Sequence, residues 1–353
     1  MRLFVQFHVA TIRDMTPLIA IPGMPQGLVE TKPAHTELPD LPGLTQLLRR
    51  ATALPSSSGW RAGVLAALGA GADTAACAVA ACAVPGLPPG SQVCFAAPLH
   101  VLAGISRVHL PPGGLLQLEP AEDNAWRAAF NAEFGPQAQL HAAAPGGAWI
   151  LVAPFAQAAR DAAPESLMGE ALERAPAADE AQRALRLLGA EVEMWLAAHA
   201  LNREREARHE PVLNVIWFSG GARVAPVMPV APMRGIVSGG RPDAWLAGLS
   251  VHAKVPVTIA PDWDAALRTL DDGGSAHADL LVVPAPDAAG SASQYLQRLE
   301  DQWFAPLAKA LEAGELDGVR LQIGERAWQV RRRPALRWLR WRRSWWQMIG
   351  QDS

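Results

Sequence analysis

The stretch of the chain richest in chemically versatile side chains runs from position 199 to position 221 and reads HALNREREARHEPVLNVIWFSGG. Its pattern predicts the end of a helix, then a charged turn, then an apolar strand that finishes on Gly220 and Gly221. Ligands of α/β proteins bind outside the carboxyl ends of strands, where glycines let backbone N–H groups approach an anion. The stretch therefore predicts a binding site for a polar ligand.

A purely structural interpretation of the same stretch stays open. In it, Asn202 caps the helix and the arginines pair with neighbouring glutamates on a solvated face, as charge runs usually do. Gly220 and Gly221 then do no more than turn the chain.

Histidine offers the next candidate chemistry. The nine histidines form no H-x-H, H-x-x-H or H-E-x-x-H pattern, so a zinc site is not expected. His100 ends a predicted strand, and His109 follows on the next one, so His100 is the candidate for proton transfer or ligand contact. The alternative is a buried histidine paired with backbone. The chain also lacks the G-x-S-x-G nucleophile motif and the phosphate-binding loop G-x-x-x-x-G-K-[ST].

Several of these residues carry a resemblance to a known family. The chain resembles a bacterial family labelled either as regulatory protein of the RpfE type or as cofactor-independent phosphoglycerate mutase-like, whose signature is N-x-x-R … N-x-x-W-x-x-G-G. The matching residues are Asn202, Arg205, Asn214, Trp217, Gly220 and Gly221. Pro98-Leu99-His100 also resembles that family's P-V-H strand. The resemblance implies an α/β fold like that of the alkaline phosphatase superfamily, with a ligand held by the six matching residues and His100.

The resemblance also implies two divalent metals held by Asp and His ligands around a Ser or Thr nucleophile. This chain departs from that pattern. The predicted first strand, residues 3–9, runs into Ala10-Thr11 where an Asp-Gly pair is required, and no Asp-His dipeptide exists. Asp287 matches one family ligand, but Ser291 replaces the histidine that should follow, and a hydroxyl is a poor ligand for transition metals. We therefore expect no metal and no cofactor.

The first functional hypothesis is a regulatory, catalytically altered relative of the phosphoglycerate mutases. Two other functional classes remain open. One is an active phosphoglycerate mutase or another phosphoryl-transfer enzyme that uses acids such as Asp271, Asp272 and Asp287 with the His100 region. The other is a binding protein for nucleic acid or an acidic membrane through its C-terminal tail. Nine arginines and one acid lie between positions 320 and 343, most of them from Arg331 to Arg343, and five of the thirteen tryptophans lie among or just after them.

The tail has its own structural prediction. Trp338, Trp341 and Trp345 fall on one face of a helix, so we expect the body of the protein or a partner to cover them. The partner stays open between a small anionic ligand, another protein, nucleic acid and an acidic membrane.

Composition places the chain among globular proteins. It has 353 residues, 50% hydrophobic and 18% charged, with a formal net charge of -3. Three cysteines without a C-x-x-C pair favour reduced thiols and a cytoplasmic location, and neither a signal peptide nor a transmembrane segment is expected.

Strand and helix patterns alternate along most of the chain, which predicts an α/β fold with a largely parallel central sheet flanked by helices. The Pro- and Gly-rich residues 16–43 are expected to form a long loop. We expect a single domain over residues 1–333, with a subdivision considered near residues 220–240, and a basic helix over residues 334–353.

Overall fold

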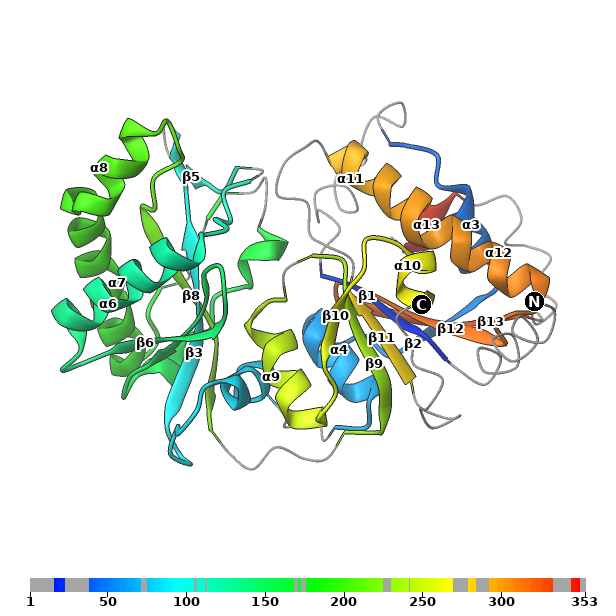
Figure 1. Cartoon of the computed structure of the whole chain (residues 1–353), viewed down its shortest axis with the longest axis horizontal. Coiled ribbons are helices and arrows are strands. Elements are labelled where there is room, and N and C mark those ends of the chain that lie inside the picture. Colours follow the sequence, from blue (N-terminus) through cyan, green and yellow to red (C-terminus); the bar gives the residue numbers. More distant parts are fainter. Residues whose placement is uncertain are drawn as a thin grey trace.

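The computed structural model describes residues 16–22, 38–70, 75–104, 107–111, 113–167, 171–172, 176–224, 230–240, 242–268, 279–283, 292–332 and 344–349. The strand predicted over residues 3–9 lies outside them, as do Asp271, Asp272, Asp287 and Ser291. Two sheets carry the described fold, one on each side of the molecule in Figure 1.

The larger sheet has seven strands in the order β10-β9-β11-β1-β12-β13-β2. Its strands are β1 (Leu18–Ile21), β2 (Ala51–Leu54), β9 (Met233–Ser238), β10 (Val257–Ile259), β11 (Asp279–Val283), β12 (Gly318–Ile323) and β13 (Arg326–Arg331). The first five strands in this order pair in parallel, whereas β13 and β2 are added antiparallel at one edge.

Strand β1 lies at the centre of this sheet, within the segment expected to be a loop, so that expectation is wrong for residues 18–21. Its four residues, LIAI, are buried on both faces of the sheet and therefore show no polar alternation. Pro17 and Pro22 flank this short apolar run, and prolines at such positions indicate a loop when the sequence is considered alone.

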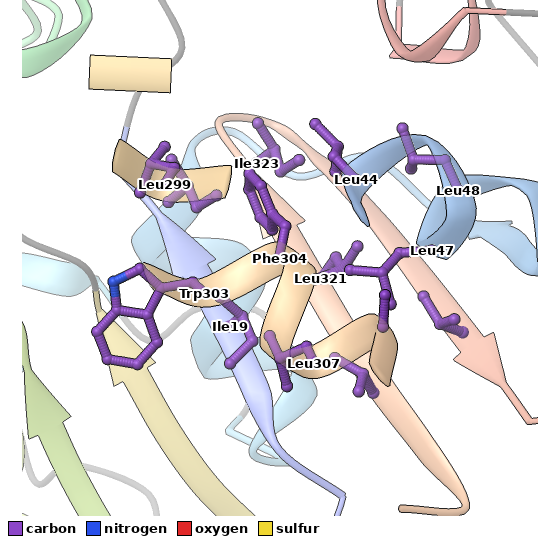
Figure 2. Packing of buried hydrophobic residues seen from close by; sticks show 14 of the residues in the cluster. Ile19, Leu44, Leu47, Leu48, Leu299, Trp303, Phe304, Leu307, Leu321 and Ile323 are labelled. Atoms are coloured by element: carbon purple, nitrogen blue, oxygen red, sulfur yellow. The ribbon is translucent and has the colours of Figure 1, made fainter. Parts of the chain in front are cut away.

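Helices cover both faces of the seven-stranded sheet. Ile19 and Ile21 of β1 pack in one hydrophobic cluster with Leu44, Phe304 and Leu307 (Figure 2). The helical elements on that face are α3 (Pro42–Arg49), α10 (Trp263–Arg268), α11 (Ala292–Leu299), the π-helical turn η4 (Glu300–Phe304), α12 (Ala305–Ala313) and α13 (Trp345–Ile349).

The opposite face of β1 belongs to a second cluster. Leu18 and Ala20 pack there with residues of α4 (Trp60–Ala67), α5 (Ala76–Ala80), the 3₁₀ turn η1 (Ala81–Ala83) and α9 (Ala244–Ala253). The same cluster contains buried residues of the other sheet, namely Val93, Ile150 and Ala222. The two sheets therefore share a hydrophobic core.

The smaller sheet has four strands in the order β6-β7-β3-β8, and all three pairings are antiparallel. Its strands are β3 (Gln92–Leu99), β6 (Gln139–Ala144), β7 (Ala148–Val152) and β8 (Val215–Arg223). Its outer face packs against α6 (Pro120–Phe134) and α7 (Glu180–Ala198), and α8 (Ala200–Ala207) follows α7 (Figure 1). The short elements nearby are β4 (Leu102–Ala103), β5 (Val108–His109), η2 (Ala156–Ala158) and η3 (Pro164–Ser166).

The α/β class is what the sequence predicts, but one largely parallel central sheet is not confirmed, because the four-stranded sheet is wholly antiparallel. Alternation of strands and helices along the chain does not reveal that β3 pairs with both β7 and β8. The chain leaves the four-stranded sheet at Arg223 and enters the seven-stranded sheet at Met233. This passage lies within residues 220–240, where a subdivision was considered.

The C-terminal helix α13 lies on the body of the protein. Trp345 is 2% exposed and donates a hydrogen bond of 3.2 Å from its indole Nε1 to the backbone oxygen of Pro39. Arg326 donates to the backbone oxygen of Ile349. The expected covering of Trp345 is therefore found, whereas Trp338 and Trp341 lie outside the described residues.

Candidate ligand site between the two sheets

A cavity of about 120 Å³ is lined by residues from both sheets. From the seven-stranded sheet come Pro22, directly after β1, and Ser238, the last residue of β9. The amino ends of α4 and α9 line it as well. The cavity thus lies at the carboxyl ends of parallel strands, where α/β folds bind their ligands.

The four-stranded sheet contributes the other wall. Phe95, Ala96 and Ala97 of β3, Trp149 of β7 and Ser219 of β8 line the cavity. Trp149 is almost fully buried, and its indole Nε1 donates a 2.6 Å hydrogen bond to Asp123, which fixes the ring. This wall is therefore mainly apolar and rigid.

One buried arginine lies between two carboxylates at the site. The Nη2 atom of Arg61, at the start of α4, lies 2.6 Å from Glu165 Oε1 and 2.6 Å from Asp243 Oδ2. Arg61 is 9% exposed, and burial alone would lower the pKa of its guanidinium. The two carboxylates outweigh burial and raise that pKa, so the arginine stays charged.

Aromatic rings enclose the arginine. Its guanidinium carbon lies 4.6 Å from the ring centroid of Trp60 and 5.1 Å from that of Phe95, within the range of cation–π attraction. Trp245 supports Trp60 by an edge-to-face contact with centroids 5.0 Å apart. Packing and charge pairing therefore hold Arg61 in place from several sides.

The cluster is not fully paired within the part of the chain that the structure describes. Glu165 Oε2, Arg61 Nε and Trp60 Nε1 are buried there without a hydrogen-bond partner. Buried polar atoms are normally satisfied, and an unsatisfied one costs about 1 to 3 kcal/mol. Such a cost at a cavity wall is typical of a site adapted for function rather than for stability.

The described residues do not fit a dinuclear metal site. Among them no group of three or more His, Cys, Asp or Glu side chains could hold a metal ion. The two carboxylates of the cavity, Glu165 and Asp243, are both held by Arg61, and Asp243 also caps α9 by accepting from Leu246 N at 2.8 Å. Both carboxylates of the cavity are therefore engaged by Arg61.

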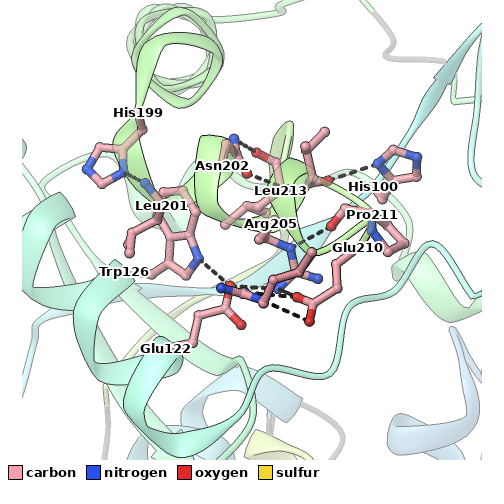
Figure 3. A network of polar contacts seen from close by, with 12 residues as sticks. His100, Glu122, Trp126, His199, Leu201, Asn202, Arg205, Glu210, Pro211 and Leu213 are labelled. Carbon is pink, nitrogen blue, oxygen red and sulfur yellow. Dashed lines mark hydrogen bonds and ion pairs between the residues drawn. The ribbon is translucent and has the colours of Figure 1, made fainter.

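The residues suggested by the sequence motif lie elsewhere. Asn202 on α8 is buried, and its Nδ2 donates to the backbone oxygens of Leu196 and Leu213 at 2.8 and 2.7 Å. Its Oδ1 accepts from Leu213 N at 2.9 Å (Figure 3). Asn202 therefore ties the junction of α7 and α8 to the segment that leads into β8.

Arg205, also buried on α8, has a similar role. Its Nε donates to the Pro211 backbone oxygen at 2.6 Å, and its Nη1 lies 2.6 Å from Glu122 Oε1 on α6 (Figure 3). Glu210 lies 3.8 Å away. The guanidinium thus joins α6, α8 and the chain before β8.

Asn214 and His100 complete this polar brace. Asn214 exchanges two 2.8 Å hydrogen bonds with the backbone of Val101. His100 Nδ1 lies 2.9 Å from the Val212 oxygen, and because a carbonyl only accepts, Nδ1 carries the proton. Antiparallel pairing of Leu99 with Val215 brings these residues to one end of the sheet.

The rest of the motif does not join them. Trp217 is buried, with its indole Nε1 donating to the Ala162 oxygen at 2.9 Å. Gly220 and Gly221 lie further along β8, roughly 20 to 23 Å from Asn214 at about 3.3 Å per residue. A single site formed by the whole motif is therefore not found.

Glycine is required at positions 220 and 221 for two different reasons. Gly220 has φ of +62°, which favours glycine, and a Cβ on Gly221 would lie 2.4 Å from the Gln157 oxygen. Gly221 N donates to the oxygen of Ala159, the residue after η2, at 2.7 Å. The preceding residue, Ser219, is the one that reaches the cavity.

Sequence reasoning missed the charged residues of the cavity. Arg61 carries the only charge in the segment WRAGVLAALGAG, and a lone charge in an otherwise apolar helix is the signal that could have identified it. Asp243 begins a helix after Pro242, which is equally compatible with a simple cap. Nothing in its sequence neighbourhood distinguishes Glu165.

The basic tail is only partly described. Of its arginines, Arg320 donates to the Ala67 oxygen at 2.9 Å and to Gln329 at 3.2 Å, and Arg326 contacts α13. Arg331 is exposed, and residues 333–343 lie outside the described part of the chain. None of the described helices has the length and apolarity that a membrane span requires.

Comparison with known proteins gives remote similarity in structure only. No protein-family model and no curated protein matches the chain. It is similar to the cofactor-independent phosphoglycerate mutase from Thermoplasma acidophilum DSM 1728, with a TM-score of 0.37 and 14% identity, covering 90% of each chain. It is also similar to the PH0037 protein from Pyrococcus horikoshii, with a TM-score of 0.43 and 13% identity, covering 90% of this chain and 88% of that one. Function must therefore be inferred from this chain's own residues.

Proposed function

We propose that this protein is a phosphoglycerate mutase-like regulatory protein, of the RpfE type, that binds a small ligand and lacks metal-dependent mutase activity. The observation that carries the proposal is the cavity between the two sheets, with Arg61 held by Glu165 and Asp243 at the carboxyl ends of parallel strands. Its walls offer charge, hydrogen bonds and aromatic faces, which are the requirements of binding.

The sequence supports the second half of the proposal. Phosphoryl transfer of the superfamily type needs two metals to orient the phosphate and activate the nucleophile. The chain lacks the Asp-His dipeptide, and Ser291 replaces the histidine after Asp287. The central strand β1 ends at Ile21 and is followed by Pro22 rather than by an acid.

The cysteines agree with a cytoplasmic protein. Cys77, Cys82 and Cys94 are free thiols. Burial raises the pKa of all three, so none is a reactive thiolate at neutral pH.

The working-enzyme alternative has less support. Its acids Asp271, Asp272 and Asp287 lie outside the described residues, and the ring of His100 is engaged by backbone through Nδ1. For the nucleic-acid and membrane alternatives, most of the residues between Arg331 and Arg343 lie outside the described part. The small-ligand proposal is the one that a described cavity favours.

The test is a phosphorus NMR assay of phosphoglycerate isomerisation by the purified protein with manganese present. We expect no turnover above the rate of buffer alone. An authentic cofactor-independent mutase under the same conditions is the positive control. Turnover that a chelator abolishes and manganese restores would refute the proposal.

A further inference from the structure

We propose that the cavity selects a small cationic ligand, a compact primary amine with an apolar body, rather than an anion. This inference rests on the proposed function, because it names the class of ligand that the same cavity binds. It departs from the anionic ligand considered from the sequence.

The lining of the cavity carries more acidic than basic side chains. Among the described lining residues, Glu165 and Asp243 are acidic and Arg61 is the sole base. Arg61 neutralises one of the two carboxylates, which leaves a net charge of 1 - 2 = -1. Apolar walls concentrate the field of such a charge within a cleft. An anion would meet repulsion there, whereas a cation would complete the pairing.

Within the described part of the chain, the acids are incompletely paired, as are the donors Arg61 Nε and Trp60 Nε1 beside them. The described residues provide no hydrogen-bond partner for Glu165 Oε2, and the Glu165 side chain is only 14% exposed. Asp243, with 35% of its side chain exposed, is the more accessible of the two. An ammonium group brings three donors on a compact centre and can therefore serve both acids.

A large part of the lining is apolar. Trp149, Phe95 and Leu116 offer aromatic and aliphatic surface, and the aromatic faces attract cations as well. A dry cavity of about 150 Å³ accommodates benzene. The cavity of about 120 Å³ in this protein therefore suits a hydrocarbon body of about four to six carbon atoms. The ligand therefore combines an ammonium head with a short branched or cyclic hydrocarbon.

The test is calorimetric titration of the full chain with three compounds that share one hydrocarbon body: isopentylamine, isopentanol and isovalerate. We expect the amine to bind about tenfold or more tightly than the other two, as one charge-assisted hydrogen bond implies. Equal or tighter binding of isovalerate, or no binding of the amine, would overturn the inference.

Two variants locate the effect. Glu165→Gln removes one of the two carboxylate charges of the cavity and keeps the shape of the side chain, so it should weaken the amine about tenfold. Gln117→Lys, at an exposed position that also lines the cavity, should weaken the amine without endangering the fold. Glu133→Gln, an exposed change on α6, is the matched control and should leave binding unchanged. Unchanged amine affinity in both test variants would contradict the inference.

Titration with phosphoglycerate separates this inference from the proposed function. Tight binding of phosphoglycerate without turnover would refute the cationic preference and leave the regulatory, non-catalytic role standing. Manganese-dependent turnover would refute the proposed function, whatever the amine does.

Discussion

Asn202 shows how a polar residue that resembles a ligand contact can serve the backbone instead. Its amide nitrogen donates to two carbonyl oxygens and its amide oxygen accepts one N–H, all in a buried position. These three bonds use the shape of the amide fully, because the donors and the acceptor point to different backbone groups. The three hydrogen bonds to backbone therefore account for the asparagine at this position of the motif.

Replacing Asn202 with Asp tests this interpretation. The substitution is isosteric, but it removes both donors and places a carboxylate against the oxygens of Leu196 and Leu213. We expect the free energy of unfolding to fall by about 2 to 5 kcal/mol in urea titrations. Asn124→Asp, on the exposed side of α6, is the control and should change stability little. An Asn202→Asp protein with unchanged stability would contradict the structural role of Asn202.

The environment of His199 predicts that the stability of the fold depends on pH. Burial, followed by the nearby charge of Arg203, lowers the pKa of its imidazole, while Glu204 opposes the shift. Its ring packs against Trp126 and Trp195, and its Nδ1 accepts from Leu201 N at 3.2 Å to cap α8. Protonation would remove this acceptor.

Because the folded-state pKa is lower than the unfolded value of about 6.5, the unfolded chain binds more protons. The contribution of His199 is therefore complete above about pH 6.5 and is lost as the pH falls through the folded-state pKa. We expect the difference in unfolding free energy between about pH 7.5 and about pH 5.5 to be smaller in His199→Asn than in the original protein. Asparagine keeps a cap on the helix but does not titrate. An identical difference in both proteins would show that His199 does not contribute.

At the scale of elements, the sequence predicts those with a strong period or a clear cap. Trp126, Ala129 and Phe130 recur at helical spacing, and the structure has the helix Pro120–Phe134 there with Trp126 and Phe130 buried. Strand β1 escapes prediction because four buried residues between prolines carry no periodic signal. The pairing of β3 with β7 and β8 escapes it because strand partners far apart in sequence are fixed by packing.

The same contrast applies to the candidate site. The motif around Asn202 is conspicuous because its polar residues are close in sequence, yet these residues bind backbone. The cavity residues Arg61, Glu165 and Asp243 come from three distant segments and meet only in the folded chain. Their distance along the chain is why sequence spacing could not reveal the cluster.

The element α13 offers a prediction of its own. Trp345 packs within the cluster that contains Leu44 and Leu47 of α3. Trp345→Ala should lower the free energy of unfolding by about 3 kcal/mol, since a buried large side chain leaves a cavity. Trp346→Ala is the comparison, because Trp346 is only partly buried, and thermal unfolding should show the smaller loss there. Equal losses would show that α13 is not held by Trp345.

At the scale of the whole molecule, the two sheets are joined by a shared hydrophobic cluster and by the Arg61–Glu165 ion pair. Arg61 lies on α4 beside the seven-stranded sheet, whereas η3, which carries Glu165, follows β7 of the four-stranded sheet. The cavity is formed between them. A ligand that contacts both sides would favour whichever arrangement of the two parts binds it more tightly.

We expect the protein to act through a ligand in this cavity and not through a pair of catalytic metals. Elemental analysis of the full chain, after equilibration with manganese and zinc and removal of unbound metal, tests this expectation. The expected result is far less than one ion per chain. A stoichiometric pair of tightly bound ions, released only by a chelator, would contradict it.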